Sequence, residues 1–283
     1  ASKPHVLYSQ KLKKYVMWFK AGSNFVSTGG LYVAFADKPS GPWSGEKVAS
    51  GNHLGHDFDI MEDENGVAYV ASDPFSGKFD MSNGTKGVPL WNVYFQQMND
   101  EKTGVSTDDK KSYQVMKEVD FEALGLFKYG KNYYITGGTT CGNCQVPISY
   151  IRSGSPFTEW QNEEGDSMEN LKSGTLIAPN GYTGQNKGAN MLPSHSGPIV
   201  LAGIWGYRTN PESRVKNGRV VHGSNSQALA STYWYPLQFD ADGKIRQMKG
   251  KPFVKVPLTR GTLTPYPLPF YQPDARIRKG KSI

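Results

Sequence analysis

The stretch that decides the fold runs from Phe121 to Gly138 and reads FEALGLFKYGKNYYITGG. Apolar and aromatic residues on both sides of a short polar segment are typical of two strands joined by a tight turn. Glu122 stands at the head of the first predicted strand, among small and apolar neighbours. Burial in such surroundings disfavours the charged form of a carboxyl group, which suits a general acid. The alternative is an ordinary hairpin whose Glu122 faces water. The rest of the sequence is needed to decide between a general acid and a solvent-exposed side chain.

The same pattern of strand, polar turn and strand recurs along the chain. Predicted hairpins cover residues 5–19, 58–71 and 124–136, with a degenerate fourth copy at 189–203. Further strands are predicted at 30–37, 91–98, 147–152 and 231–239. A hairpin with one or two added strands is one blade of a β-propeller, so we predict an all-β propeller.

The predicted propeller domain covers residues 1–256, and the Pro-rich segment 257–283 is predicted to be an extended C-terminal tail. Helix signals are few: a helical turn is predicted at 118–124 and a short helix at 166–172. Gly137-Gly138 is predicted to form a turn.

The composition supports many short strands. The chain has 283 residues, of which 37% are hydrophobic and 20% charged, so a large buried core is feasible. Its 32 Gly, 18 Pro and 16 Tyr favour turns and strands over helices. The net charge of +7 is scattered except in the tail at 276–281, so we expect no nucleic-acid partner. No apolar run reaches the roughly 18 residues of a membrane-spanning helix, so we expect no membrane partner either.

The two cysteines lie close together, in Cys141-Gly142-Asn143-Cys144. A structural zinc site needs about four ligands, and no second pair is present. We expect a local disulfide, with two free thiols as the alternative. Asn83-Gly84-Thr85 is an N-glycosylation sequence in a Gly-rich loop. Together these features predict a secreted, extracellular protein.

In a propeller the first strand of each blade lines the central channel. The residues that open the predicted hairpins are therefore candidate site residues, and they are 2–5, 56–59, Glu122 and 185–190. Two carboxylates from neighbouring blades can flank one bond, where one protonates a leaving oxygen and the other tunes its pKa or activates water. Asp57 and Glu122 form such a pair.

Metal binding is the alternative for part of this set, since His53, His56, Asp57 and Asp59 all offer ligand atoms. The chain lacks the helical His spacing of zinc enzymes, and we expect neither a transition metal nor an organic cofactor. A structural calcium or sodium ion in the channel stays open, because hard cations take oxygen ligands. His195 is predicted to be a turn residue.

Several segments resemble, in order, motifs of glycoside hydrolase family 43, and most of all its fungal exo-β-1,3-galactanase-like branch. KPHVLY with KYVMWF (3–8 and 14–19) is similar to that branch's RPKVIYN and KYVMW. The other matching segments are 57–69, 122–138, 185–193 and 233–243. The resemblance covers about residues 2–248, and it implies a five-bladed β-propeller.

The resemblance also implies roles for single residues. Glu122 takes the place of the general acid, Gln185 stands where a catalytic base is expected, and Asp57 matches an Asp of the sugar-binding funnel. Trp18 matches an aromatic residue that stacks on a sugar face. The remaining expected substrate contacts are His5, Asp59, Thr139, Trp205 and Arg208. The expected partner is a polysaccharide or oligosaccharide, bound by a monomer.

The chain departs from this pattern at four places. Ser2 replaces a Glu, Leu124 replaces the Pro of a Glu-Ala-Pro motif, and Asn143-Cys144 stands where the branch has a Trp. The blade that family members carry before Ala1 is expected to be missing or incomplete here, and in most of the family that blade supplies the base. We predict an inverting glycosidase, because no second carboxylate is evident as a nucleophile. The alternatives are a catalytically inactive carbohydrate-binding propeller and a structural or protein-binding propeller.

Overall fold

The computed structural model describes residues 2–21, 30–82, 87–140, 148–167, 170–178, 189–191, 198–204, 214–216, 219–221, 231–247, 254–255 and 264–265. Within these ranges the chain is built from β-strands, with 3-10 structure only at η1 (Asp109–Lys111) and at Asn170. This confirms the predicted all-β class. None of the helical structure in these ranges is long and apolar enough to cross a membrane.

The described strands up to residue 178 form three antiparallel sheets. The first sheet has the strand order β1 (Ser2–Ser9), β2 (Lys14–Lys20), β3 (Leu31–Ala36) and β4 (Ser44–Val48). The second has the order β5 (Phe58–Glu62), β6 (Ala68–Ser72), β8 (Val88–Gln97) and β7 (Phe75–Asp80), and β9 (Ser112–Val119) also pairs with β8. The third has the order β10 (Glu122–Tyr129), β11 (Asn132–Gly138), β12 (Ile148–Ser153) and β13 (Thr175–Ala178).

Smaller sheets follow in the C-terminal part. A three-stranded sheet has the order β14 (Ala189–Met191), β15 (Pro198–Ile204) and β18 (Ser231–Pro236). Two strand pairs complete the set: β16 (Arg214–Lys216) with β17 (Arg219–Val221), and β19 (Val254–Lys255) with β20 (Thr264–Pro265). The β20 residues lie inside the stretch predicted to be a tail.

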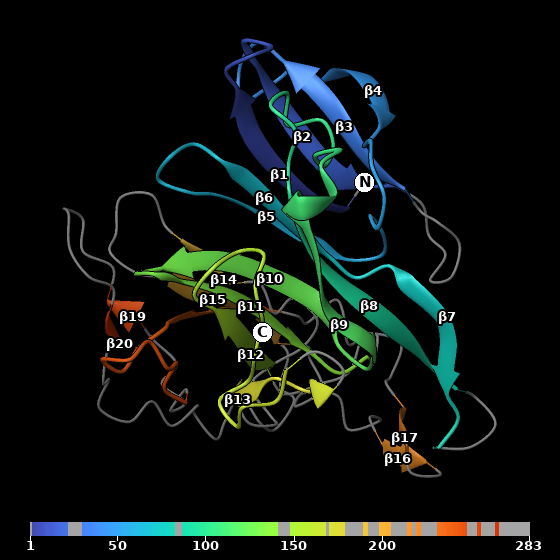
Figure 1. Cartoon of the computed structure of the whole chain (residues 1–283), viewed down its shortest axis with the longest axis vertical. Coiled ribbons are helices and arrows are strands. Elements are labelled where there is room, and N and C mark those ends of the chain that lie inside the picture. Colours follow the sequence, from blue (N-terminus) through green and yellow to red (C-terminus); the bar gives the residue numbers. More distant parts are fainter. Residues whose placement is uncertain are drawn as a thin grey trace, which may run out of the picture.

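The first strands of consecutive sheets lie next to one another. β1 contacts β5, β5 contacts β10, and β10 contacts β14, while the later strands of each sheet extend away from this line (Figure 1). Inner strands meet in this way in a propeller. The sheets of the described residues do not close into a ring, so the count of five blades and the missing first blade stay predictions.

The four predicted hairpins are confirmed by the antiparallel pairs β1–β2, β5–β6, β10–β11 and β14–β15. The helical turn predicted at 118–124 is wrong, because these residues end β9 and begin β10. Gly137 and Gly138 lie in β11 and not in a turn. β4 was not predicted, since every residue of this strand is exposed and it has no apolar alternation to reveal it. The helix predicted at 166–172 lies partly outside the described residues.

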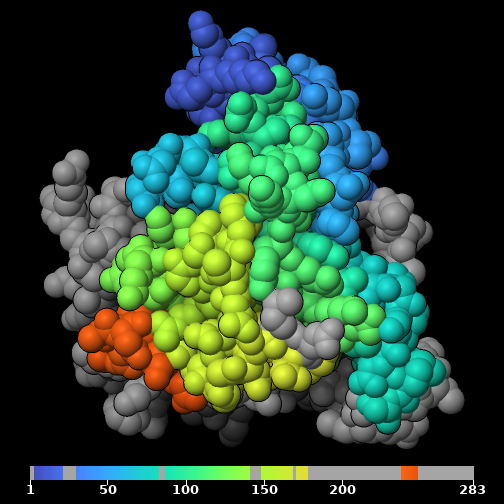
Figure 2. Space-filling view, viewed as in Figure 1, coloured from blue at the N-terminus to red at the C-terminus, as the bar shows by residue number. Residues whose placement is uncertain are grey.

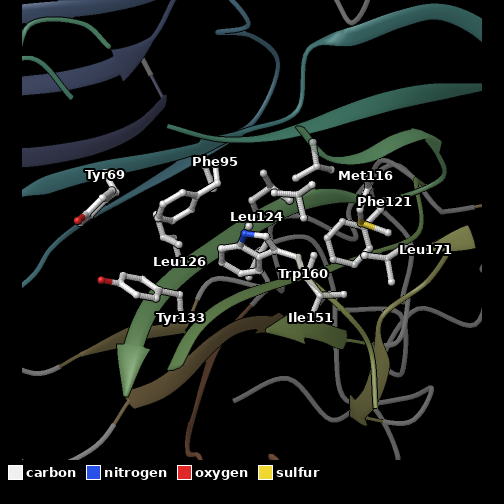
Figure 3. Close-up of a cluster of buried hydrophobic side chains, with 14 of the residues drawn as sticks. Tyr69, Phe95, Met116, Phe121, Leu124, Leu126, Tyr133, Ile151, Trp160 and Leu171 are labelled. Carbon is white, nitrogen blue, oxygen red and sulfur yellow. The ribbon is translucent and has the colours of Figure 1, made fainter. Parts of the chain in front are cut away.

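The largest core cluster joins the second and third sheets (Figure 3). Trp160 and Phe95 lie at its centre, with ring centroids 5.2 Å apart. Leu126 of β10 and Ile151 of β12 pack into the same cluster from the third sheet. This contact fixes β10, and with it Glu122, against the sheet that carries Asp57.

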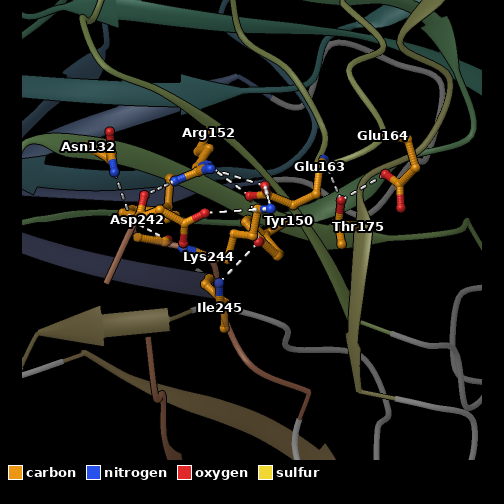
Figure 4. Close-up of polar contacts among 11 residues, drawn as sticks. Asn132, Tyr150, Arg152, Glu163, Glu164, Thr175, Asp242, Lys244 and Ile245 are labelled. Atoms are coloured by element: carbon orange, nitrogen blue, oxygen red, sulfur yellow. Dashed lines mark hydrogen bonds and ion pairs between the residues drawn. The ribbon is translucent and has the colours of Figure 1, made fainter. Parts of the chain in front are cut away.

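The segment 237–246 is fastened to the outside of the third sheet by polar contacts (Figure 4). Arg152 donates to the carbonyl of Asp242 over 2.6 Å, and the backbone N–H of Ile245 donates to the hydroxyl of Tyr150 over 3.0 Å. Glu163 also pairs with Arg152, over 2.7 Å. In the space-filling view this segment lies against the surface of the third sheet (Figure 2). It therefore adds a fixed outer layer behind β10 and β11.

Candidate active site

The inner strands β5 and β10 run side by side in the same direction. The backbone N–H of Leu126 donates to Asp59 Oδ2 over 2.6 Å, and further along both strands Lys128 Nζ lies 2.5 Å from Glu64 Oε1. The beginnings of β5 and β10 therefore point to one end of the inner strands. Asp57, just before β5, and Glu122, the first residue of β10, lie toward this end.

Asp57 is held between two ammonium groups. Lys3 Nζ of β1 lies 2.8 Å from Asp57 Oδ2, and Lys20 Nζ of β2 lies 3.6 Å from Asp57 Oδ1. Burial raises the pKa of Asp57, but Lys3, His56 and Lys20 outweigh it and hold that pKa well below its usual range. Asp57 is therefore an anion at neutral pH.

Asp59 connects three of the inner strands, β1, β5 and β10. Its carboxylate accepts hydrogen bonds from the backbone N–H of Ile60 at 2.8 Å and of Leu126 in β10, and it lies 3.3 Å from His5 Nδ1 of β1. Burial raises the pKa of Asp59, against the opposing effect of His5. Asp59 is 2% exposed, so its place is that of a brace between strands.

Glu122 opens β10 and is 1% exposed. Its backbone pairs with Gly138, after which the β10–β11 register shifts through a bulge before Gly125. The next residue, Ala123, has φ +58°, in the left-handed region that non-glycine residues rarely adopt. β1 has the same combination of a bulge and a left-handed residue, since Lys3 has φ +52° beside a bulge between Ser2 and His5. Bulges and left-handed residues of this kind concentrate where a strand re-aims a functional side chain.

A second carboxylate supports the backbone of Asp57. Asp73, just after β6, accepts a hydrogen bond from the N–H of Asp57 over 2.5 Å, and its own N–H donates to the carbonyl of Asp57 over 3.1 Å. His56 Nδ1 lies 3.5 Å from Asp73 Oδ1 and 3.9 Å from Asp57 Oδ1. We call Lys3, His5, Lys20, His56, Asp57, Asp59 and Asp73 the polar cluster.

The ionisation of the His56–Asp73 pair is set by burial and by mutual attraction. Burial lowers the pKa of His56, but Asp73 and Asp57 outweigh it and the pKa lies above its ordinary value. Burial raises the pKa of Asp73 to about 6, although the hydrogen bond with His56 opposes this rise. The pKa of each partner therefore lies above its ordinary value, for Asp73 because of burial and for His56 because of the two carboxylates beside it.

His56, Asp57 and Asp73 place one ligand atom each within 4.8 Å of one another, which is the spacing of a metal site. The cluster, however, already contains cations, since Lys3 and Lys20 pair with both oxygens of Asp57. A metal ion would have to displace these ammonium groups. His53, from the alternative metal set, instead stacks on Tyr94 with ring centroids 4.1 Å apart. We assign no metal to this cluster.

The structure argues against the expected role of Trp18. Its side chain is fully buried, and its ring N–H donates to the carbonyl of Lys102 over 2.7 Å. A buried indole has no face to offer to a sugar, so Trp18 is a core residue here. His5 and Asp59 both belong to the polar cluster, and Thr139 is exposed just after β11, while their expected contacts with substrate stay predictions.

The other predicted site residues lie outside the described residues. They are Gln185, Trp205 and Arg208, the cysteines Cys141 and Cys144, the glycosylation residue Asn83, and His195. Their expected roles stay predictions.

Sequence reasoning missed Lys20, Asp73 and Trp91. Asp73 could have been predicted, because extending the β5–β6 pairing by one residue beyond Phe58 and Ser72 places Asp73 opposite Asp57. Lys20 could have been predicted in the same way, since it is the register partner of Ser2 at the start of β1. Trp91, which stacks on His56 with ring centroids 3.9 Å apart, gave no such signal.

Comparison with solved structures shows which proteins share this architecture. An exo-β-1,3-galactanase from Phanerochaete chrysosporium with β-1,3-galactotriose superposes with a TM-score of 0.64 at 21% identity, over 93% of this chain and 51% of that one. An exo-β-1,3-galactanase from Clostridium thermocellum gives 0.60 at 15% identity, over 93% and 51%. A family 43 endo-arabinanase from Bacillus licheniformis gives 0.57 at 16% identity, over 86% and 75%.

The chain thus spans about half the length of the galactanase chains that it matches. No protein-family model and no curated protein sequence matches it. The likeness lies in the fold, and it agrees with the sequence motifs quoted above. This chain has the fold of the family 43 glycoside hydrolases, and its structural neighbours are mainly exo-β-1,3-galactanases.

Proposed function

We propose that this protein is a glycoside hydrolase that cleaves β-1,3-linked galactan from a chain end, with Glu122 as the general acid. The observation that carries the proposal is the position of Glu122. It opens an inner strand, beside a bulge and a left-handed residue, at the same end as the polar cluster, in a fold shared with glycosidases of family 43. A buried carboxyl group at such a place suits protonation of a leaving oxygen.

In this proposal Asp57 orients the sugar and Gln185 orients the attacking water. Asp57 is ionised and fixed by Lys3, so it offers a fixed hydrogen-bond acceptor to a sugar hydroxyl. The reaction inverts the anomeric configuration, because water attacks directly when no carboxylate acts as a nucleophile. The protein acts outside the cell, where such polysaccharides occur.

A specific observation favours the alternative of a catalytically inactive carbohydrate-binding protein. Lys3 and Lys20 both pair with Asp57, so this carboxylate is engaged and does not stand free as a base. A site of this kind holds sugar hydroxyls without activating water.

The decisive experiment compares the wild type with Glu122→Gln on β-1,3-galactotriose. An enzyme loses turnover by roughly a hundredfold or more in the variant, because proton donation contributes about 10²–10⁴-fold, and its galactotriose affinity is kept. Glu64→Gln is the matched control, since Glu64 lies at the opposite end of the inner strands and is 65% exposed on its side chain. Binding without turnover in the wild type supports the inactive alternative, and no binding rejects both.

The stereochemical part is tested separately. Proton NMR of the first-formed galactose shows the α-anomer if the enzyme inverts, and the β-anomer would reject the inverting mechanism.

A further inference from the structure

His56 is enclosed by groups that have no part in the proposed proton transfer. Its ring stacks on Trp91 of β8, with centroids 3.9 Å apart and planes 15° from parallel. On its edge lie Asp57 and Asp73, whose oxygens are 3.9 and 3.5 Å from Nδ1. The side chain of His56 is 9% exposed, so the imidazole lies nearly buried between the indole of Trp91 and two carboxylates.

Trp91 is itself held in place on several sides. It is fully buried, and its ring N–H donates to Thr140 Oγ1 over 2.8 Å. Thr140 is fixed in turn, because its backbone N–H donates to Asp120 Oδ1 over 2.5 Å. Phe75 packs edge-on against the indole, with centroids 5.9 Å apart. The indole under His56 is therefore fixed in place. The face of an indole attracts a charged imidazolium more strongly than a neutral imidazole.

Asp57 is held both by its backbone and by its side chain. Asp73 binds the backbone N–H of Asp57, while Lys3 and Lys20 bind its side chain. A protonated His56 attracts both carboxylates and shields them from each other. A neutral His56 leaves two buried carboxylates facing each other with one cation fewer, and like charges in such a site repel.

We propose that His56 is a positioning residue: its imidazolium, stacked on Trp91 and placed between Asp57 and Asp73, helps Lys3 and Lys20 to hold the carboxylate of Asp57 in its sugar-orienting position, and loss of its proton weakens that hold. The role of Asp57 toward the sugar rests on the proposed function. The coupling between His56 and Asp57 does not, because it follows from the contacts alone.

The charged groups that face His56 act in known directions. Asp73 after β6 and Asp57 before β5 favour the charged imidazole, and Lys20 of β2 opposes it. Lys3 of β1 acts on Asp57. The pKa of His56 lies above its ordinary value, so the imidazolium predominates at weakly acidic pH and is lost as the pH rises through that raised pKa.

The first test follows His56 and Asp57 by NMR in the free protein, without any sugar. The ring proton Hε1 of His56 reports its own titration, and the carboxyl ¹³C shift of Asp57 is followed in the same samples. The expected result is a step in the Asp57 shift at the pH where His56 loses its proton, absent in His56→Gln. An Asp57 shift that stays flat while His56 titrates overturns the proposal.

The second test uses Asp73→Asn, which keeps the shape of the side chain and removes its charge. We expect the titration of His56 to move to lower pH in this variant, since its strongest attractive partner is neutral. An unchanged titration overturns the bridge between these two residues. His53→Gln is the control, because His53 also stacks on an aromatic ring but makes no ion pair among the described residues.

The third test measures galactotriose binding by calorimetry between pH 5.5 and 8.5. We expect the wild-type Kd to weaken about tenfold across the titration of His56, since the sugar loses part of a hydrogen bond to a fixed charged group, and His56→Gln to bind weakly with no such step. A pH-independent wild-type Kd overturns the functional part. If galactotriose does not bind at any pH, the proposed function fails, and the NMR step alone decides whether His56 controls Asp57.

Discussion

The two ends of the inner strands carry similar charges in opposite surroundings. At the end where β1, β5 and β10 begin, Asp57 and Asp59 are buried and engaged by Lys3 and His5. At the other end, Glu64 pairs with Lys128, and its side chain is 65% exposed. The carboxylates of the first end need their partners to offset the cost of burial, whereas Glu64 at the second end is solvated with or without its partner.

A hollow of about 610 Å³ marks the second end, and it is lined by Ile60–Glu64 of the β5–β6 hairpin and Leu126–Gly130 of the β10–β11 hairpin, with Leu7 of β1. Two of its three acidic residues pair with lysines, Glu62 with Lys102 and Glu64 with Lys128, while Asp63 accepts hydrogen bonds from backbone N–H groups of its own turn. Both inner strands are regular here, and the bulges are confined to the first end. The two ends therefore differ in the backbone of the inner strands and in the kind of charge that is buried: bulges and buried carboxylates occur at the end that we propose for catalysis, whereas the second end has regular inner strands and the buried Lys102.

The largest effect is expected when a buried carboxylate of the first end is removed. Asp59→Ala leaves the buried N–H of Leu126 without its acceptor and His5 Nδ1 without its partner, so we expect a loss of about 3 kcal/mol in the free energy of unfolding. Urea denaturation measures this loss. Asp59→Asn is the control, because its side-chain oxygen still accepts from Leu126, and it should lose clearly less. Equal stability of wild type and Asp59→Ala would contradict the role of Asp59 as a brace.

The second largest effect is expected when the close packing beside Glu122 is disturbed. A Cβ on Gly137 of β11 would lie 2.5 Å from a ring carbon of Phe121 and 2.9 Å from the carbonyl oxygen of Glu122. Gly137→Ala should therefore cost about 1–3 kcal/mol by overpacking and should displace Glu122, which would lower turnover of galactotriose. Gly154→Ala is the matched control, since its added Cβ meets nothing within 4 Å. If both variants behave alike, the close packing beside Glu122 is not what positions it.

The fold was predictable because its signals are local. Each inner hairpin has two apolar runs around a polar turn, so β1–β2, β5–β6 and β10–β11 were visible from short windows of sequence. The edge strand β4 was not visible, because none of its residues is buried and the pattern of alternation needs one buried face. The helical turn predicted at 118–124 was wrong because pairing of β9 with β8 overrides the local preference.

The candidate site was predictable only in part, since its contacts join distant segments. Asp57, Asp59 and His5 could be named because each opens or follows the opening of an inner strand. Trp18 was given the wrong role because its partner, the carbonyl of Lys102, lies 84 residues away and cannot be read from the sequence around Trp18. The stack of His56 on Trp91 depends on the same kind of long-range packing.

The smallest effect is expected at the second end. The pKa of Glu64 is lowered by its hydrogen bond with Lys128, so any stabilisation is present above the ordinary pKa of Glu and is lost as the pH falls through the lowered value. Glu64 is solvent-exposed, however, and salt screens such a pair.

We therefore expect Glu64→Gln to leave the urea midpoint unchanged at neutral pH and physiological salt, and to leave galactotriose turnover unchanged. The same measurement on Asp59→Ala under the same conditions gives the contrast, since a buried carboxylate is poorly screened. A marked loss of stability in Glu64→Gln that persists in high salt would show that the second end also depends on its charges. The difference between the two ends would then lie in the backbone irregularity beside Lys3 and Ala123 and not in burial.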